Sequence, residues 1–430
     1  MIGNYSRLRK EEERGGVPTK QPAVPSRRPV TVTSTSCSMR LRFSLLAHLF
    51  LFLPCNICKG SLPDCPCEDV TLCETIQGPP VRPKEIFGFT GTLGMNWTHI
   101  TTVAWVTDEK LVCKAHQHGV RAILAAPSFD LETEMQIPER RAAWIKDALN
   151  LVRSKFADGL VFDYESPQPA ESAAGHAYAR LIAETRRVFQ AVNPSYQIST
   201  CVPWSPDSID GRDFPWLELA DASDLLYVMD YDTRSQIFDA CIASANAPFP
   251  GMVRGIQRFF DLGIEPNKLV LGVPWYGYKY KCLPGTLPDA IYCPIQRVPF
   301  RGVDCSDAAG TEVPYSTIVS ELQSTNASIT GGLRRDANMD APFFNVVGSN
   351  GTVYQFWYDD AASLRRKYTW ARKHNLRGVG PYTFSDLDPN GRDTDVWSAF
   401  DVFLQDDDDD DMPHSLIRKR DEGDATGTST

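Results

Sequence analysis

Short apolar runs alternate with longer segments of helical periodicity along most of this 430-residue chain, and this pattern constrains the fold more than any other feature. Runs of about four to eight apolar residues between turn-forming residues are typical of buried parallel strands. Eight such runs lie at residues 86–89, 100–105, 121–125, 160–163, 197–202, 225–229, 269–273 and 379–384. Eight strands that alternate with helices predict an α/β fold, the (β/α)8 TIM barrel.

Two of the intervening segments show the apolar stripe of an amphipathic helix. The first begins with Pro138, a residue type that is favoured at the first helical position. Its apolar positions recur at spacings of four, three and four residues, at Ile145, Leu149, Val152 and Phe156. The second segment begins at Glu171, repeats the pattern and ends before Pro194, which cannot continue a helix. Both segments therefore predict helices.

Residues 61–404 are predicted to form one catalytic domain, because a barrel with excursions commonly occupies such a length as a single unit. The alternation fails at residues 276–351, which are rich in Gly, Pro and Cys. We interpret this segment as a loop-rich insertion after the seventh strand, on the C-terminal face of the barrel. Residues 405–430 contain a run of six Asp residues and a basic triplet, which predict a disordered acidic tail.

Residues 1–60 are predicted to comprise an N-terminal extension and a signal peptide, with an apolar h-region at about residues 43–54. This stretch is shorter than the roughly 20 residues that span a bilayer, so we expect no stable membrane anchor. The sequence is compatible with a start at Met1 or at Met39. Three N-x-[ST] sequons, at Asn96, Asn326 and Asn350, fit the same export route. We therefore expect a lysosomal or secreted protein.

Nine of the 12 cysteines follow the predicted cleavage site, and export predicts that they form disulfides. The odd number leaves one thiol, for which Cys201 is the candidate because it lies in a predicted buried strand. Metal binding is the weaker alternative, since no pair of CxxC motifs occurs at zinc spacing. We expect His116 and His118 to be solvated, and we expect no metal or cofactor.

The composition, with 42% hydrophobic and 23% charged residues, is typical of a globular protein and excludes fibrous and membrane classes. The net charge of −10 argues against a nucleic-acid partner, because phosphate binding requires clustered Lys and Arg. Dinucleotide loops, GxSxG elbows and HExxH motifs are not recognisable in the sequence. We expect a monomer.

The segment from Asp158 to Glu165, DGLVFDYE, is the strongest indication of chemistry. Side chains alternate between the two faces of a strand, so Val161, Asp163 and Glu165 point one way. Two carboxylates then project from the barrel interior at the C-terminal rim, where barrel enzymes hold their catalytic groups. Nearby like charges raise the pKa of one carboxyl and allow Glu165 to act as a general acid. The alternative is that both acids only end a strand and meet solvent or a Lys.

The DGxxxDxE spacing resembles the signature of chitinase-like glycoside hydrolase family 18. Further segments resemble the family in the expected order, at residues 229–232 (an MxYD motif), 235–238, 245–248, 272–278, 299–302 and 305–310. The likeness covers roughly Cys65 to Phe400. Within the family it points to the lysosomal branch that cleaves chitobiose units.

This resemblance implies a retaining, substrate-assisted glycosidase. It implies that Glu165 protonates the glycosidic oxygen, that Asp163 accepts the acetamido N–H, and that Tyr231 holds the acetamido oxygen. Asp158 is expected to support the strand from behind. The implied substrate-binding residues are Met229, Asp232, Trp275 and Tyr382, although Trp275 is equally compatible with a core position.

Two positions depart from the family pattern. Val161 stands where the family usually has Asp or Asn, so that Asp163 loses a polar neighbour and is expected to titrate differently. Tyr382 stands where the eighth strand commonly presents Trp beneath the bound sugar, and we expect weaker stacking there.

The resemblance predicts hydrolysis of β-1,4-linked N-acetylglucosamine in chitobiose units of N-glycans or short chitin oligosaccharides, with action at the reducing end. One alternative is an endo-acting chitinase, which residues 122–129 disfavour because they lack the SxGG segment of many chitinases. The other is a non-catalytic, chitinase-like lectin, which the presence of Glu165 disfavours. The sequence leaves the preferred oligomer length, the pH optimum and the disulfide pairing open.

Overall fold

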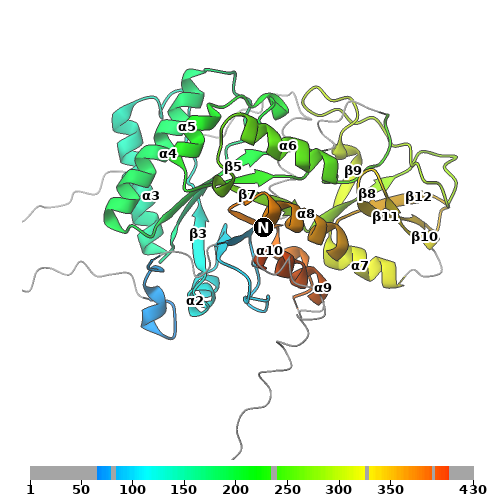
Figure 1. The fold of residues 1–430 in the computed structure, drawn as a ribbon, viewed down its shortest axis with the longest axis horizontal. Helices are drawn as coiled ribbons and strands as arrows, with labels where there is room; N and C mark the ends of the chain where they lie inside the picture. Colours follow the sequence, from blue (N-terminus) through cyan, green and yellow to red (C-terminus); the bar gives the residue numbers. More distant parts are fainter. Residues whose placement is uncertain (1–64, 79–83, 234–239, 325–328, 390–392, 406–430) are drawn as a thin grey trace, which may run out of the picture. The chain divides into compact units, whose positions relative to one another are not determined.

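A computed structural model describes residues 65–78, 84–233, 240–324, 329–389 and 393–405 (Figure 1). The predicted signal peptide, the predicted acidic tail, the motif at 235–238 and the sequon at Asn326 lie outside these described residues. Among the residues that the structure does describe, no helix is long and apolar enough to cross a membrane.

Eight parallel strands close a barrel in the order β1-β13-β7-β6-β5-β4-β3-β2. The strands are β1 (Glu85–Phe89), β2 (Thr102–Ala104), β3 (Arg121–Ala125), β4 (Gly159–Phe162), β5 (Gln197–Pro203), β6 (Leu225–Met229), β7 (Leu269–Pro274) and β13 (Gly378–Tyr382). Each predicted run coincides with one strand, and the bounds differ by no more than two residues at either end. The predicted (β/α)8 barrel is therefore confirmed.

From β2 onward a helix follows each strand of the barrel, and Figure 1 shows α3 to α6 in succession along its outside. They are α2 (Glu109–Gln117), α3 (Pro138–Ser154), α4 (Ala173–Val192), α5 (Trp216–Ala222), α6 (Phe249–Asp261) and α8 (Ala361–Lys373), followed by α9 (Thr394–Trp397) and α10 (Asp401–Leu404). Both predicted helices are confirmed. Pro138 opens α3, and the Ser172 side chain caps α4 by accepting a hydrogen bond from the Gly175 N–H.

The core has two layers that follow the alternation of side chains along the strands. The barrel interior holds Phe87, Phe89, Ala104, Ile123, Val161, Cys201, Leu225, Tyr227, Met229 and Val270. The outer layer lies between strands and helices, and it receives Leu160 and Phe162 of β4. Val161 faces inward and its two neighbours face outward, as the period-two alternation predicts.

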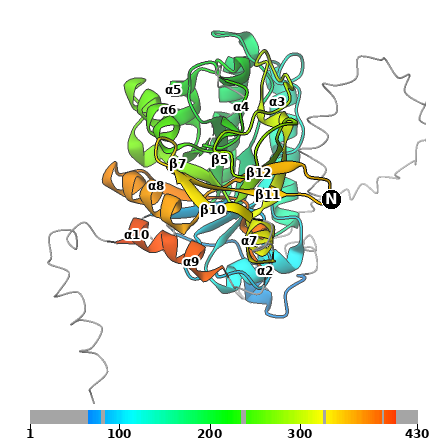
Figure 2. The same ribbon diagram turned by 90° about the vertical axis from the view of Figure 1, so that its right-hand side faces the viewer.

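The insertion after β7 is confirmed, but it is a folded antiparallel sheet rather than mainly loops. Its strand order is β10-β11-β12-β8-β9, and it continues beyond the expected end at residue 351. The elements are β8 (Tyr276–Lys281), β9 (Gly310–Pro314), α7 (Tyr315–Ser324), β10 (Ile329–Asp336), β11 (Ala341–Val347) and β12 (Val353–Trp357). Figures 1 and 2 show this sheet beside α7. Tyr276, Tyr278 and Tyr280 alternate with Gly and Lys, a strand signal that the abundant Gly and Pro obscured.

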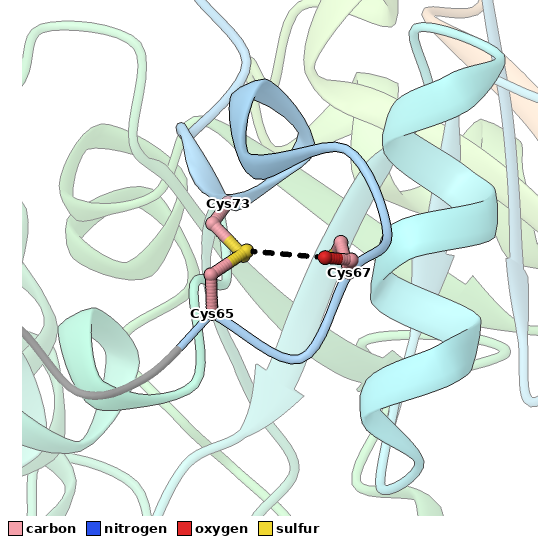
Figure 3. Close-up of side chains that lie close together, drawn as sticks. All are labelled: Cys65, Cys67 and Cys73. Atoms are coloured by element: carbon pink, nitrogen blue, oxygen red, sulfur yellow. Dashed lines mark hydrogen bonds between the residues drawn. A yellow bond between two sulfur atoms is a disulfide. The ribbon is translucent and has the colours of Figure 1, made fainter.

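Four disulfides join the cysteines of the described segments, and they leave Cys201 as a buried thiol, as predicted. Cys241–Cys305 and Cys282–Cys293 hold the insertion. The sulfurs of Cys65, Cys67 and Cys73 gather near α2 within metal-binding distance of one another (Figure 3). Their sulfurs are bonded as Cys65–Cys73 and Cys67–Cys113, however, so they offer no thiolate ligands.

Asp158 joins the N-terminal segment to the start of β4, at the end of the strand opposite Glu165. Its carboxylate accepts hydrogen bonds from the N–H groups of Ile76 and Ala122, both at 2.7 Å, and from Nε2 of His116 at 2.8 Å. The expectation that His116 is solvated is wrong, because it is buried. Its Nδ1 lies 2.7 Å from the carbonyl oxygen of Leu72, which can only accept a hydrogen bond.

Two acceptors around one imidazole favour the doubly protonated ring of His116. Burial lowers the pKa of His116, but the hydrogen bond and charge of Asp158 and the Leu72 carbonyl outweigh it and raise the pKa above its ordinary value. The buried pair therefore stabilises the fold most strongly where His116 is charged.

Replacing His116 by Gln is expected to lower the free energy of unfolding by about 3 kcal/mol at pH 5.5, since Asp158 then keeps a buried charge without its cation. Because the folded pKa is raised, the contribution of the pair is complete below about pH 6.5 and is lost as pH rises through that pKa. Urea unfolding across this range measures the effect. The control, His176→Gln, removes an exposed pair with Glu218 and should change little. A constant difference from pH 5.5 to 9 would contradict this interpretation.

Asp230 follows β6 and points outward into the layer beneath α8. Its carboxyl is buried and accepts no hydrogen bond from the described residues. Lys367 of α8 donates instead to Oδ2 of Asp359 at 2.8 Å and to the Ala247 carbonyl at 2.6 Å. Burial raises the pKa of Asp230 to about 7, although Lys367 lowers it and Asp359 raises it further. Ionisation of Asp230 therefore opposes folding.

Asp230→Asn is expected to make the melting temperature less dependent on pH between about 4 and 7. In the unfolded chain Asp230 ionises near pH 4, whereas the folded carboxyl stays protonated to about pH 7, so stability falls across this interval. The neutral amide removes that loss, and scanning calorimetry at several pH values measures it. This interval lies below the one that His116 governs. Parallel curves for the variant and the wild type would show that Asp230 is ionised in the fold.

Candidate active site

The carboxylates of DGLVFDYE lie directly after β4, at the C-terminal end of the barrel. Tyr164 turns outward and packs against Phe129 and Tyr178. The alternation that begins with Val161 in the interior therefore directs Asp163 and Glu165 toward the barrel mouth, and both are half-buried.

Glu165 is held by two arginines from different loops. Its Oε2 accepts a hydrogen bond from Nη1 of Arg212 at 3.1 Å, and its main-chain oxygen accepts one from Nη1 of Arg301 at 3.1 Å. Arg212 belongs to the loop between β5 and α5, whereas Arg301 belongs to the insertion. Both arginines also contact Asp210, at 3.0 and 3.5 Å. The segment after β4 is thus tied to the next loop and to the insertion.

Tyr231 approaches the same mouth from β6. Its ring packs on the interior cluster that contains Val161 and Met229, and it stacks on Tyr382 with centroids 5.3 Å apart. Burial raises the pKa of Tyr231 well above its ordinary value, and the negative charge of Asp163 raises it further. Tyr231 therefore stays protonated and can donate a hydrogen bond at any physiological pH.

Asp232 has a left-handed backbone (φ 55°) and lies where β6 meets the insertion. Its Oδ1 accepts hydrogen bonds from the hydroxyls of Tyr276 and Tyr278 of β8, at 2.6 and 2.8 Å. Its main-chain N–H donates to Oδ1 of Asn246 at 2.6 Å. These contacts hold the carboxylate in one orientation beside Tyr231.

An aromatic wall closes the mouth at β13, β1 and β2. Tyr382, the last residue of β13, contacts Phe89 at 5.7 Å and the edge of Trp105 at 5.9 Å between ring centroids. Alternation from the inward-facing Ala104 would direct Trp105 outward, but its positive φ of 57° turns its ring onto the interior cluster. Its buried indole N–H has no hydrogen-bond partner among the described residues.

Trp275 does not join this group, and the expectation that it lies beneath the sugar is wrong. It is 1% exposed and packs in the outer layer against Phe384, Trp397 and Phe400. The period-two alternation explains this position, because Leu269, Leu271 and Val273 of β7 also face the outer layer. Of its two proposed positions, the core is therefore the observed one.

The structure brings most of the remaining predicted residues to one end of the barrel. Those near the mouth are Asp163, Glu165, Met229, Tyr231, Asp232 and Tyr382, whereas Asp158 lies at the opposite end of β4. The sequence interpretation missed Arg212, Trp105 and the two tyrosines that hold Asp232. Tyr276 and Tyr278 could have been predicted, because they belong to the segment 272–278 that carries the family likeness. Arg212 and Trp105 depend on loop geometry, which no spacing rule reveals.

Two carboxyl groups at the end of the barrel, one of them near a protonated phenol, are suited to acid–base chemistry on a sugar. A carboxyl that carries a proton can give it to a leaving oxygen. A second carboxylate and a phenol O–H can bind the two ends of an amide group, one by accepting and the other by donating a hydrogen bond.

Comparison with known proteins identifies the relatives of this chain. The model of the glycosyl hydrolases family 18 matches residues 125–386. The di-N-acetylchitobiase of Homo sapiens is 39% identical over 333 residues, which cover 76% of this chain and 84% of that protein. The di-N-acetylchitobiase of Mus musculus is 37% identical over 343 residues, which cover 79% of this chain and 91% of that protein.

Solved structures share the fold at low sequence identity. The class V chitinase of Nicotiana tobaccum is 17% identical, with a TM-score of 0.59 over 74% of this chain and 99% of that one. The group IV chitinase of Ostrinia furnacalis is 18% identical, with a TM-score of 0.60 over 75% of this chain and 98% of that one. The family match, the chitobiase relatives and the barrel together show that this chain belongs to glycoside hydrolase family 18.

Proposed function

We propose that this glycoside hydrolase cleaves β-1,4-linked N-acetylglucosamine in chitobiose units of N-glycans or in short chitin oligosaccharides. The proposal is supported by the position of Asp163 and Glu165 directly after β4, at the C-terminal end of the barrel, and by the effect of the Asp163 charge on the pKa of Tyr231. Because fold alone does not determine activity, the proposal depends on these side chains.

In the proposed reaction Glu165 donates its proton to the glycosidic oxygen, and the bond between that oxygen and the anomeric carbon breaks. The acetamido oxygen of the substrate attacks the anomeric carbon and forms an oxazolinium ion. Asp163 accepts a hydrogen bond from the acetamido N–H and balances the positive charge, and Tyr231 donates to the acetamido oxygen. Water, deprotonated by Glu165, then opens the oxazolinium with overall retention.

The names of related proteins support the substrate class. Relatives that cover more than two thirds of this chain are named di-N-acetylchitobiase. Structures with the same fold were solved with N-acetylglucosamine oligomers, such as a tobacco chitinase variant with NAG4 and a Cycas revoluta chitinase with (GlcNAc)3. Action at the end of short chains, rather than inside long ones, is the finer part of the proposal.

Several features support a location in lysosomes or outside the cell. The four disulfides of the described segments suit an oxidising compartment. The acceptor Asn96 and Asn350 are both exposed, as glycosylation requires. His116 and Asp230 both make the fold more stable in acid, which suits a lysosomal enzyme.

The full chain is expected to hydrolyse N-acetylglucosamine dimers and tetramers, and Glu165→Gln is expected to lower kcat by about 10²- to 10⁴-fold, because Gln has no proton to donate. The control is Glu218→Gln, which alters an exposed carboxylate beside His176 and should retain full activity. Chromatography of the products with the reducing end labelled identifies which end is released. Absence of turnover in the wild type would favour a lectin, whereas internal cleavage of longer chains would favour an endo-chitinase.

Val161→Asn is expected to shift the acidic limb of the kcat/KM profile to lower pH. An amide at this inward position can donate a hydrogen bond to the Asp163 carboxylate, which lowers the pKa of that carboxyl. Val161→Ala controls for the loss of packing in the interior cluster and should leave the limb in place. An unchanged acidic limb in Val161→Asn would show that Asp163 does not depend on its strand neighbour.

A further inference from the structure

Glu165 belongs to a buried ion pair that the proposed reaction does not use. Nη1 of Arg212 lies 3.1 Å from Oε2 of Glu165, and the two side chains are 5% and 14% exposed. The other arm of the guanidinium, Nη2, donates to Oδ2 of Asp210 at 3.0 Å. The cation therefore contacts the same carboxyl that has to carry and release a proton.

The loop that carries Arg212 is joined to the segment that follows Glu165. The N–H of Gln168 donates to the carbonyl of Gly211 at 2.9 Å, and the N–H of Asp213 donates to the carbonyl of Gln168 at 2.8 Å. Nε of Arg212 also donates to the Ile209 carbonyl at 3.2 Å. The guanidinium thus has little freedom to move away from Glu165.

Such a cation changes the proton affinity of a carboxyl in a predictable direction. An Arg guanidinium keeps its charge at all physiological pH values, and it favours the ionised form of a neighbouring carboxyl. Val161, the inward residue before Asp163, is apolar and offers neither a charge nor a hydrogen bond. Arg212 therefore acts on the pKa of Glu165 in the opposite direction to Asp163, the acidic neighbour on the same segment.

We infer that Arg212 is a positioning residue of this enzyme, which orients the carboxyl of Glu165 and confines proton donation to acidic solution. The inference rests on the proposed role of Glu165 as the general acid. When the O–H bond of Glu165 breaks, the proton bonds to the glycosidic oxygen, and the electron pair of the broken C–O bond passes to that oxygen. Arg212 stabilises the carboxylate that remains, so it makes Glu165 a stronger acid but one that is protonated over a narrower pH range.

Among the described residues, other charged groups around Glu165 come from several elements. Asp163 precedes it on the same segment, and Arg301 of the insertion contacts its main-chain oxygen. Asp210 forms ion pairs with both Arg212 and Arg301, and its negative charge weakens their effect on the pKa of Glu165. Glu132, from the segment after β3, accepts a hydrogen bond from Gln168 at 3.2 Å. Tyr231 stays protonated because its pKa is raised, so it adds no charge. Arg212 is the cation in contact with the reacting carboxyl in the described structure.

The test compares full-length variants by their pH–rate profiles. Arg212→Met is expected to move the alkaline limb of kcat/KM up by about one pH unit, because the pKa of Glu165 rises. It should also lower kcat about tenfold on the acidic side, because the acid is weaker. Arg212→Lys keeps the charge and should shift the limb less. Asp210→Asn leaves Arg212 with less competing negative charge, so the limb should move in the opposite direction, to lower pH.

A matched control separates electrostatics from folding. Arg186 forms a more exposed Arg–carboxylate pair with Asp224 at 2.7 Å, at the opposite end of the barrel from Glu165, so Arg186→Met should not move the alkaline limb. Titration of the Glu165 carboxyl by 13C NMR, assigned with Glu165→Gln, gives the same comparison without turnover. An inactive wild type would refute the proposed hydrolysis, whereas the titration would still test Arg212. The inference would be overturned if Arg212→Met changed neither the alkaline limb of kcat/KM nor the titration midpoint of Glu165. It would also be overturned if Arg186→Met shifted both as much as Arg212→Met does.

Discussion

Alternation of side chains along eight parallel strands is the constraint on which the rest of this structure depends. It sends Val161 into the interior and Tyr164 outward, and it leaves Asp163 and Glu165 facing the mouth. Applied to β6, the same rule places Tyr231 inside and Asp230 in the outer layer. Fold and chemistry therefore share one physical cause, because closing the barrel brings the ends of strands that are far apart in sequence to a common rim.

The two ends of the barrel serve different purposes. At the N-terminal end of β4, Asp158 joins His116 and two backbone N–H groups and secures the segment that carries the first disulfides. At the other end, Arg212 and Arg301 hold Glu165 by its side chain and its backbone. The first network is closed and buried, whereas the second surrounds the carboxyl that we propose as the general acid. This division follows the common separation of stability from catalysis in such barrels.

Periodicity and motif spacing predicted what is regular in this chain, and loop geometry accounts for what they missed. All eight strands, both helices and the position of Cys201 outside the disulfides follow from local patterns. The motif around Trp275 predicted a position beneath the sugar, but the alternation of side chains along β7 places Trp275 in the core. Arg212 and Trp105 could not be predicted, since a loop contact and a positive φ place them. The insertion looked like loops because its abundant Gly and Pro obscured the alternation of its strands.

The most direct test of the central claim is the stereochemistry of the first product. Proton NMR during hydrolysis of a short N-acetylglucosamine oligomer distinguishes the anomers before mutarotation mixes them. Participation of the acetamido group, with Glu165 acting first as acid and then as base, predicts that the newly formed reducing end appears as the β-anomer. Initial release of the α-anomer would mean direct attack by water on the opposite face of the sugar, which contradicts the account.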